Sequence, residues 1–251
     1  MIKRKVRFLI GLVWAGKLLT NMTWAEVDSR RHLLFHFDKI VIEGALDVFI
    51  EPGGRNREVE IFADSEIIDS IVCQVANRTL FLDANNTYSL RRRIPFIGLS
   101  AVRRFPVEIL IKIEKLNEIR LLGESNLTVK NINAPQFKFI GESSGNAHLE
   151  DLVSADLFIH HAGSGDIAIR GNKIDQLNAR ILGSGNLSAE ELFLDHATVD
   201  HRGSGLVSLV PNLWLDAKIN GPGDLRLLEK PKGMVFNRSE GAGKLIEDYG
   251  R

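Results

Sequence analysis

Apolar and polar positions alternate along much of the chain, and the alternation keeps its phase from one glycine-rich turn to the next. The residues four and six positions after each turn begins are mostly apolar, and the position between them is mostly small or polar. This period of two predicts strands with one buried face. The best-kept apolar pairs are Ala147 with Leu149, Ile167 with Ile169, and Leu187 with Ala189.

The turns form an internal repeat of about 20 residues. Gly-Ser-Gly occurs at 163–165, 183–185 and 203–205, and an isolated related turn begins at Gly44. The glycines are expected to supply backbone conformations with positive φ, and the Asn or Asp side chains after them to bond local backbone or to stack as a ladder. The structural turn residues predicted in this way are Gly123, Gly145, Gly163, Gly165, Gly183, Gly185, Gly203, Gly205, Gly221, Gly223, Asn146, Asp166 and Asn186.

A second strand precedes each turn, with apolar residues six and four positions before it. The inward column six positions before the turns reads Phe137, Leu157, Leu177, Ala197, Leu215 and Val235. The outward column three positions before them includes His160, Arg180, Asp200 and Lys218, which we interpret as a salt-bridge ladder. One such unit cannot bury its apolar face alone, so the units must stack at about 4.8 Å.

The pattern therefore predicts an all-β fold, a single-stranded β-helix (β-solenoid) with coils of about 20 residues. Residues 26–251 are expected to form one domain, with irregular first coils over 35–113 and regular repeats over 114–251. A propeller with two units per blade is the structural alternative. The last coil is expected to be degraded, because Glu247 stands where other coils have an apolar residue. Cys73 lies among apolar residues and is expected to be a buried, unreactive thiol.

A basic insertion interrupts the first coils at 85–106. It contains no acidic residue and surrounds the apolar stretch 94–99 with arginines. One interpretation is a binding loop for an anionic polysaccharide or lipopolysaccharide phosphate, and the other is a solvated loop whose apolar middle packs on the solenoid. The candidate anion-binding residues are Arg91, Arg92, Arg93, Arg103 and Arg104.

The N-terminus has the features of a secretory signal. A basic start precedes the apolar run 8–15, and Thr23-Trp24-Ala25 offers a cleavage site. The apolar run is too short to span a membrane, although an uncleaved anchor is the alternative. Removal of residues 1–25 leaves 27 basic and 32 acidic side chains, a mildly acidic exported protein. That balance does not favour nucleic-acid binding, and it argues against attachment of the whole protein to anionic lipid.

Catalytic and metal-binding patterns are weak. His161 and His201 lie two coils apart, which is too far for one metal ion bound directly by both. His160 and His161 are adjacent in a strand and should point to opposite faces. The turn serines have no partner histidine at a fixed offset, so nucleophilic catalysis is unsupported. We expect no cofactor, metal or catalytic residue.

The repeated Gly-Ser-Gly-[Asn/Asp] turns, the opening run 37–44, the run 47–50 and the signal together resemble the putative auto-transporter adhesin, head GIN domain family of bacteria. The resemblance covers roughly residues 35–247. It implies a secreted or envelope-exposed β-helical domain with an adhesion role. We therefore expect a solenoid that is pectin-lyase-like in general architecture, in the periplasm or on the cell surface. We expect a non-enzymatic, adhesin-like binding module, with a surface glycan or envelope protein as partner and no nucleic acid. The alternatives are a carbohydrate-active β-helix enzyme and a ligand-free envelope protein with a structural or stress-related role.

Overall fold

The computed structural model describes residues 27–54, 57–94, 97–238 and 241–249, and for 87–103 it describes the backbone. The predicted signal, residues 1–25, lies outside this range. The first strands are β1 (Val27–Leu33), β2 (Lys39–Gly44), β3 (Asp47–Pro52), β4 (Glu58–Asp64), β5 (Val72–Ala76), β6 (Thr79–Ala84), β7 (Thr87–Ile94), β8 (Ile97–Arg104) and β9 (Val107–Ile113). They are followed by β10 (Glu118–Gly123), β11 (Asn126–Lys130), β12 (Gln136–Ser143), β13 (Ala147–His161), β14 (Ile167–Ile181), β15 (Leu187–His201), β16 (Val207–Ile219), β17 (Leu225–Leu227), β18 (Gly233–Arg238) and β19 (Leu245–Glu247).

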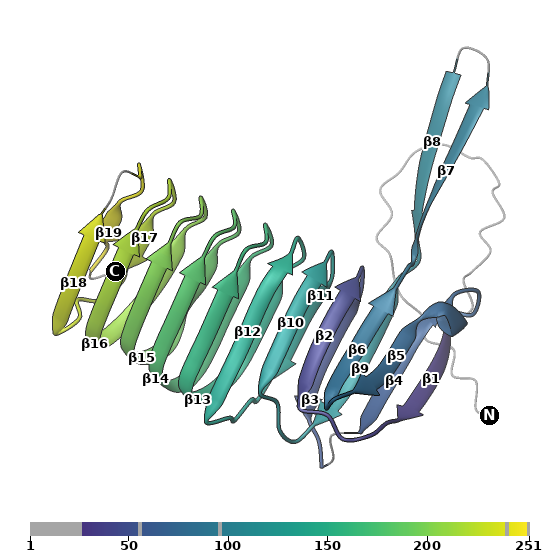
Figure 1. Ribbon diagram of the computed structural model, residues 1–251, viewed down its shortest axis with the longest axis horizontal. Helices are drawn as coiled ribbons and strands as arrows, with labels where there is room; N and C mark the ends of the chain where they lie inside the picture. The colour runs from purple at the N-terminus through teal and green to yellow at the C-terminus, as the bar shows by residue number, and fades with distance from the viewer. Residues whose placement is uncertain (1–26, 55–56, 95–96, 239–240, 250–251) are drawn as a thin grey trace, which may run out of the picture.

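The strands stack as the coils of a β-solenoid (Figure 1), which confirms the predicted fold class. From β10 onward each strand pairs in parallel with the equivalent strand of the next coil, for example Leu157 with Leu177 and Leu177 with Ala197. Among the described residues the helical element is one short 3₁₀ turn, η1 (Ile68–Ser70), and no helix is long and apolar enough to cross a membrane.

The predicted inward columns form the core. Ile167, Ile169 and Leu187 are at most 3% exposed, and the same holds for the equivalent residues of most coils. Each fully buried aliphatic side chain of this size contributes about 1.5–3 kcal/mol, and only the neighbouring coils bury it. The stack is thus held together by contacts between successive coils.

Two positions depart from the predicted alternation. Val235 was expected to face inward but is 43% exposed, because the last coil pairs one residue out of phase, with Ala217 opposite Phe236. Met234 instead lies opposite Leu215, and Phe236, opposite Ala217, packs against the core. Ser208 was expected to face outward, yet it is buried.

The repeat glycines serve close stacking rather than positive φ, so that prediction was wrong for most of them. Among the described glycines only Gly44 and Gly123 have positive φ, at 90° and 68°. A Cβ atom on Gly165 would lie 1.9 Å from the carbonyl oxygen of Gly145, in the preceding coil. Glycine is therefore required because any side chain would overlap the backbone one coil below.

The predicted ladder of amide and carboxylate side chains is confirmed. The Asn146 side-chain oxygen accepts from the backbone N–H of Asp166 at 2.9 Å, and Asp166 accepts in turn from Asn186 at 2.9 Å. The Asn186 side-chain oxygen then accepts from Leu206 at 2.8 Å. Each step thus supplies an acceptor to the backbone of the next coil.

The first coils do not stack in chain order. Strands β2 and β3 pair on one side with β10 and β11, and on the other with β6 and β9. The chain therefore completes one coil and folds back outside it before joining the regular repeats. Strands β4 and β5 pair antiparallel with β9 and β6, and β1 pairs antiparallel with β4, so they cover this end of the stack.

The basic insertion forms a hairpin rather than an irregular loop. Strands β7 and β8 pair only with each other, antiparallel, and make a separate two-stranded sheet. Figure 1 shows this hairpin projecting from the solenoid beyond the row of turns. Its base is fixed by Asn86, which is buried and donates to the carbonyl oxygens of Ala45 and Phe105 at 2.8 and 2.7 Å.

Candidate functional site

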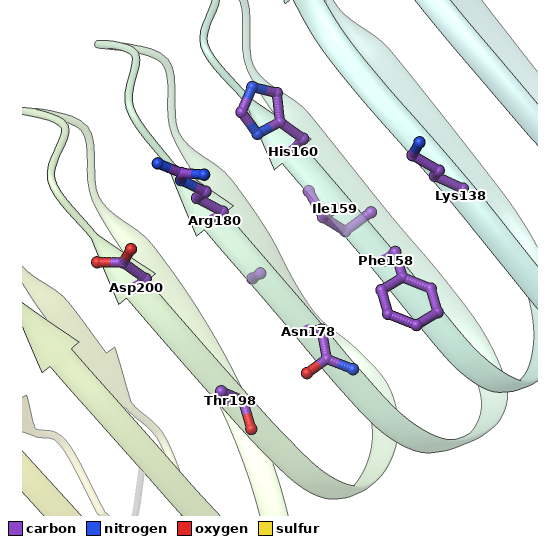
Figure 2. A pocket seen from close by; sticks show the side chains of 9 residues that line it. Lys138, Phe158, Ile159, His160, Asn178, Arg180, Thr198 and Asp200 are labelled. Atoms are coloured by element: carbon purple, nitrogen blue, oxygen red, sulfur yellow. The ribbon is translucent and has the colours of Figure 1, made fainter.

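An open groove of about 340 Å³ lies on the outer face of the solenoid, across strands β12 to β15. Figure 2 shows its side chains projecting from neighbouring coils. The groove is lined by Lys138, Phe158, Ile159, His160, Asn178, Ala179, Arg180, Thr198 and Asp200.

The strand register brings these side chains together in two columns. His160, Arg180 and Asp200 are successive partners in one column. Phe158, Asn178 and Thr198 are partners in the other, two residues earlier on each strand. Residues two apart on a strand share a face, so the same alternation that buries Ile159 and Ala179 turns both columns outward.

The sequence predicted salt bridges between charged residues of the outward column in neighbouring coils, but Arg180 and Asp200 do not form them. Asp200 pairs at 2.8 Å with Arg202, which directly follows the end of β15, and not with Arg180 or Lys218. That carboxylate also holds the pKa of Arg202 above its usual value. Arg180 has no ion-pair partner among the described residues, so the expected salt-bridge ladder is wrong at this point. The side chain that satisfies Asp200 comes from the same coil, two residues further along the chain.

Other groups in the groove are also free to meet a ligand. The side chains of Asn178 and Thr198 make no hydrogen bond to another described residue, and Phe158 is 40% exposed. Lys138 lies at the edge, where Glu118 is 3.9 Å away. The groove thus combines a partly exposed aromatic ring, hydrogen-bonding groups and an unpaired guanidinium.

The sequence indicated half of this site. The column with His160, Arg180 and Asp200 was identified as outward, but Phe158, Asn178 and Thr198 were not singled out. They occur five positions before successive turns, so the repeat phase could have placed them beside the first column. The signal was weak because the column mixes an aromatic, an amide and a hydroxyl residue.

Two buried histidines lie on the opposite side of the same strands. His161 and His201 are at most 1% exposed, with Ile181 between them in the column, as the alternation predicted. Burial lowers the pKa of both imidazoles. His201 Nε2 lies 2.9 Å from the carbonyl oxygen of Gly205, so this nitrogen carries the proton of a neutral ring. Both rings are core components and are inaccessible to substrate.

The described part of the chain holds no group of three or more His, Cys, Asp or Glu side chains placed to bind a metal ion. Cys73 is partly buried rather than fully buried, and burial raises its pKa to about 11. The thiol is therefore protonated near neutral pH, and it is a poor nucleophile.

The candidate anion-binding arginines are divided along the hairpin. Arg91, Arg92 and Arg93 lie opposite Ser100, Leu99 and Gly98, far along the strands. Arg103 and Arg104 lie opposite Tyr88 and Thr87, at the base. Arg104 also pairs with Glu124 of the solenoid at 3.5 Å. The structure therefore separates three distal arginines from two basal ones.

The fold defines a parallel β-solenoid protein with an open groove on its outer face. The chain belongs to the family described as putative auto-transporter adhesin, head GIN domain, whose model matches residues 36–231. This confirms the resemblance drawn from the repeated turns. No curated protein matches the chain.

Solved structures of similar proteins share the fold. A putative adhesin from Bacteroides fragilis is 18% identical, with a TM-score of 0.75 over 88% of this chain and 96% of that one. A putative lipid binding protein from Parabacteroides distasonis is 20% identical, with a TM-score of 0.64 and the same coverage. A putative adhesin from the latter species is 20% identical, with a TM-score of 0.54 over 89% and 97%. At these identities the likeness shows the fold alone.

Proposed function

We propose that this protein is a non-enzymatic binding module, exported to the periplasm or cell surface, whose outer-face groove binds a glycan that carries carboxylate groups. One observation carries the proposal: Arg180, Asn178 and Thr198 have no described partners and line the same groove as a partly exposed Phe158.

Each part of the groove matches a part of an acidic sugar. The face of Phe158 offers an apolar platform for the C–H face of a pyranose ring. The side chains of Asn178 and Thr198 can each donate and accept hydrogen bonds, which suits the hydroxyl groups of a sugar ring. The Arg180 guanidinium has donors in a planar fork that matches a carboxylate.

The spacing of the coils suits an extended chain. Phe158, Asn178 and Thr198 lie on successive strands, about 4.8 Å apart. A linear glycan laid across the coils would therefore meet one side chain of this column at each strand. Arg180 and Asp200 would meet the substituents on one side of that chain.

The alternatives are less well supported by the groove. A carbohydrate-active enzyme needs a general acid and base, but the groove's one carboxylate, Asp200, is held by Arg202. A ligand-free envelope protein would not need an unpaired guanidinium beside a partly exposed aromatic ring. The family name, which refers to adhesins, agrees with a binding role.

Binding to an array of acidic and neutral glycans tests the proposal. The array includes oligogalacturonates and neutral oligosaccharides, and the proteins are the wild type and the Arg180→Gln variant. We expect selective retention of acidic glycans and a loss of about 10- to 100-fold in affinity for the variant, the value of a charged hydrogen bond.

Lys218→Gln provides the matched control. Lys218 is the next cation of the same outward column, opposite Asp200, but it does not line the groove. Its loss changes the net charge equally and should leave affinity nearly unchanged. Equal losses of glycan affinity for Arg180→Gln and Lys218→Gln, or equal binding of acidic and neutral glycans, would contradict the proposed site.

A further inference from the structure

The hairpin β7–β8 carries an arrangement that the groove does not explain. The segment from Ala84 to Val107 contains five arginines and no acidic residue. The register places Arg91, Arg92 and Arg93 on the distal half, beside the apolar positions Ile94, Ile97 and Leu99. Three of the five arginines and three apolar residues therefore occur together on the distal half of the hairpin.

A hairpin whose outer part is not supported by the solenoid would be stabilised by a binding partner. Two strands that pair only with each other are marginally stable in water. The solenoid anchors the base through Asn86 and through the pair of Arg104 with Glu124, but it pairs with neither strand farther out. Since the distal half carries apolar residues without support from the solenoid, it is the part that a partner would stabilise.

We propose that the hairpin docks on an anionic, phosphate-bearing lipid surface. Arginine binds phosphate strongly through its planar fork of donors. Apolar residues next to the arginines suit a lipid surface, where they reach the acyl boundary while the guanidinium groups meet the headgroups. A soluble polyanion would use the arginines and leave Ile97 and Leu99 without a role.

The acidic body does not oppose this docking. The distal arginines lie four to six residues beyond Thr87, or roughly 13–20 Å from the base at 3.3 Å per residue. The Debye length at physiological salt is about 8 Å, so the charge of the solenoid is largely screened at that distance. The net charge of the whole chain therefore does not decide the behaviour of the hairpin.

Vesicle co-sedimentation of the mature chain tests the proposal. The vesicles contain phosphatidylcholine alone or phosphatidylcholine with phosphatidylglycerol. The wild type should sediment with the anionic vesicles only. The triple variant R91S/R92S/R93S should partition on the order of 100-fold less, from the usual contribution of each basic residue near an anionic surface.

Two further variants separate the causes. The triple variant K230S/K232S/K244S removes the same charge from exposed positions at the far end of the solenoid and should bind like the wild type. The double variant I97S/L99S keeps every arginine, and it should lose vesicle binding while it retains binding to heparin, a soluble sulfated polysaccharide. Far-UV circular dichroism should be the same for all variants, since none alters the core.

Several outcomes would overturn the proposal. Absence of binding to anionic vesicles, together with heparin binding that depends on the distal arginines, would assign the hairpin to polysaccharide instead. Equal losses of vesicle binding for R91S/R92S/R93S and K230S/K232S/K244S would show that binding depends only on net charge. Full vesicle binding by I97S/L99S would show that the apolar positions do not contact lipid.

Discussion

At the scale of single residues, the repeat is determined by what lies directly beneath each turn. Gly165 and Gly185 approach the carbonyl oxygens of Gly145 and Gly165, one coil below, as closely as a residue without a side chain allows. The sequence identified these glycines as essential but gave the wrong reason. Positive φ and close backbone approach both select glycine, and only the stacked coils distinguish them.

Alanine at Gly165 should therefore destabilise the protein strongly. Its Cβ atom would stand 1.9 Å from a backbone oxygen, which cannot move without shifting a whole coil. We expect the free energy of unfolding to fall by at least about 2 kcal/mol in chemical denaturation. Gly54→Ala is the control, because no atom lies within 4 Å of the added Cβ, and it should change stability by under about 0.5 kcal/mol. Similar midpoints for the two variants would contradict the stacking argument.

The buried histidines should make stability depend on pH. Burial lowers the pKa of His161 and His201 in the folded state, whereas the unfolded chain titrates near its ordinary value of about 6.5. Below that pH the unfolded state binds more protons, so stability is complete above about pH 6.5 and is lost as the pH falls. The slope should reach at most about 1.4 kcal/mol per pH unit for each histidine.

Denaturation between pH 5 and pH 8, a range of about 3 units around the histidine pKa, measures this dependence. The double variant H161L/H201L should show a shallower slope, because neither buried ring remains to be protonated. His148→Gln, at an exposed position, should keep the slope of the wild type. An unchanged slope in the double variant would assign the dependence to other groups.

At the scale of elements, the strands of the regular coils were predictable because one period of two recurs in phase with the turns. The strands of the hairpin were not predictable, because the run of arginines interrupts the apolar–polar alternation that is typical of a strand with one buried face. The exposure of Val235 was missed for a different reason. The last coil pairs one residue out of phase, which turns Val235 outward and Phe236 inward, and the turn spacing does not predict this shift.

Paired substitutions on β14 test the alternation directly. Ile167 is 3% exposed, so Ile167→Asp buries a carboxylate without a partner and should cost several kcal/mol. Ala168 lies between His148 and Ser188 on the outer face, and Ala168→Asp should cost well under about 1 kcal/mol. Chemical denaturation compares the two, and equal midpoints would be incompatible with a buried Ile167 and an outward Ala168.

At the scale of the whole molecule, stacking of the coils aligns equivalent residues of successive repeats in columns on the outer face. Sequence predicted the stack, the Asn/Asp ladder and the outward column, because each depends on neighbours one repeat away. It did not predict that β2–β3 would lie between β6–β9 and β10–β11, since that order depends on pairing between residues up to 79 positions apart. The groove could not be predicted from the sequence alone, because the strand register that aligns its two columns across β13, β14 and β15 is known only from the structure.

The central claim, that the outer groove binds an acidic glycan, is tested most directly by nuclear magnetic resonance. The labelled protein is titrated with the acidic glycan retained best on the array. We predict that the backbone amide shifts change most at Phe158, Asn178, Arg180 and Thr198, on β13 to β15, and that Arg180→Gln abolishes the changes. Shifts confined to the turns, to the β7–β8 hairpin or to the opposite face, with the groove amides unmoved, would contradict the account.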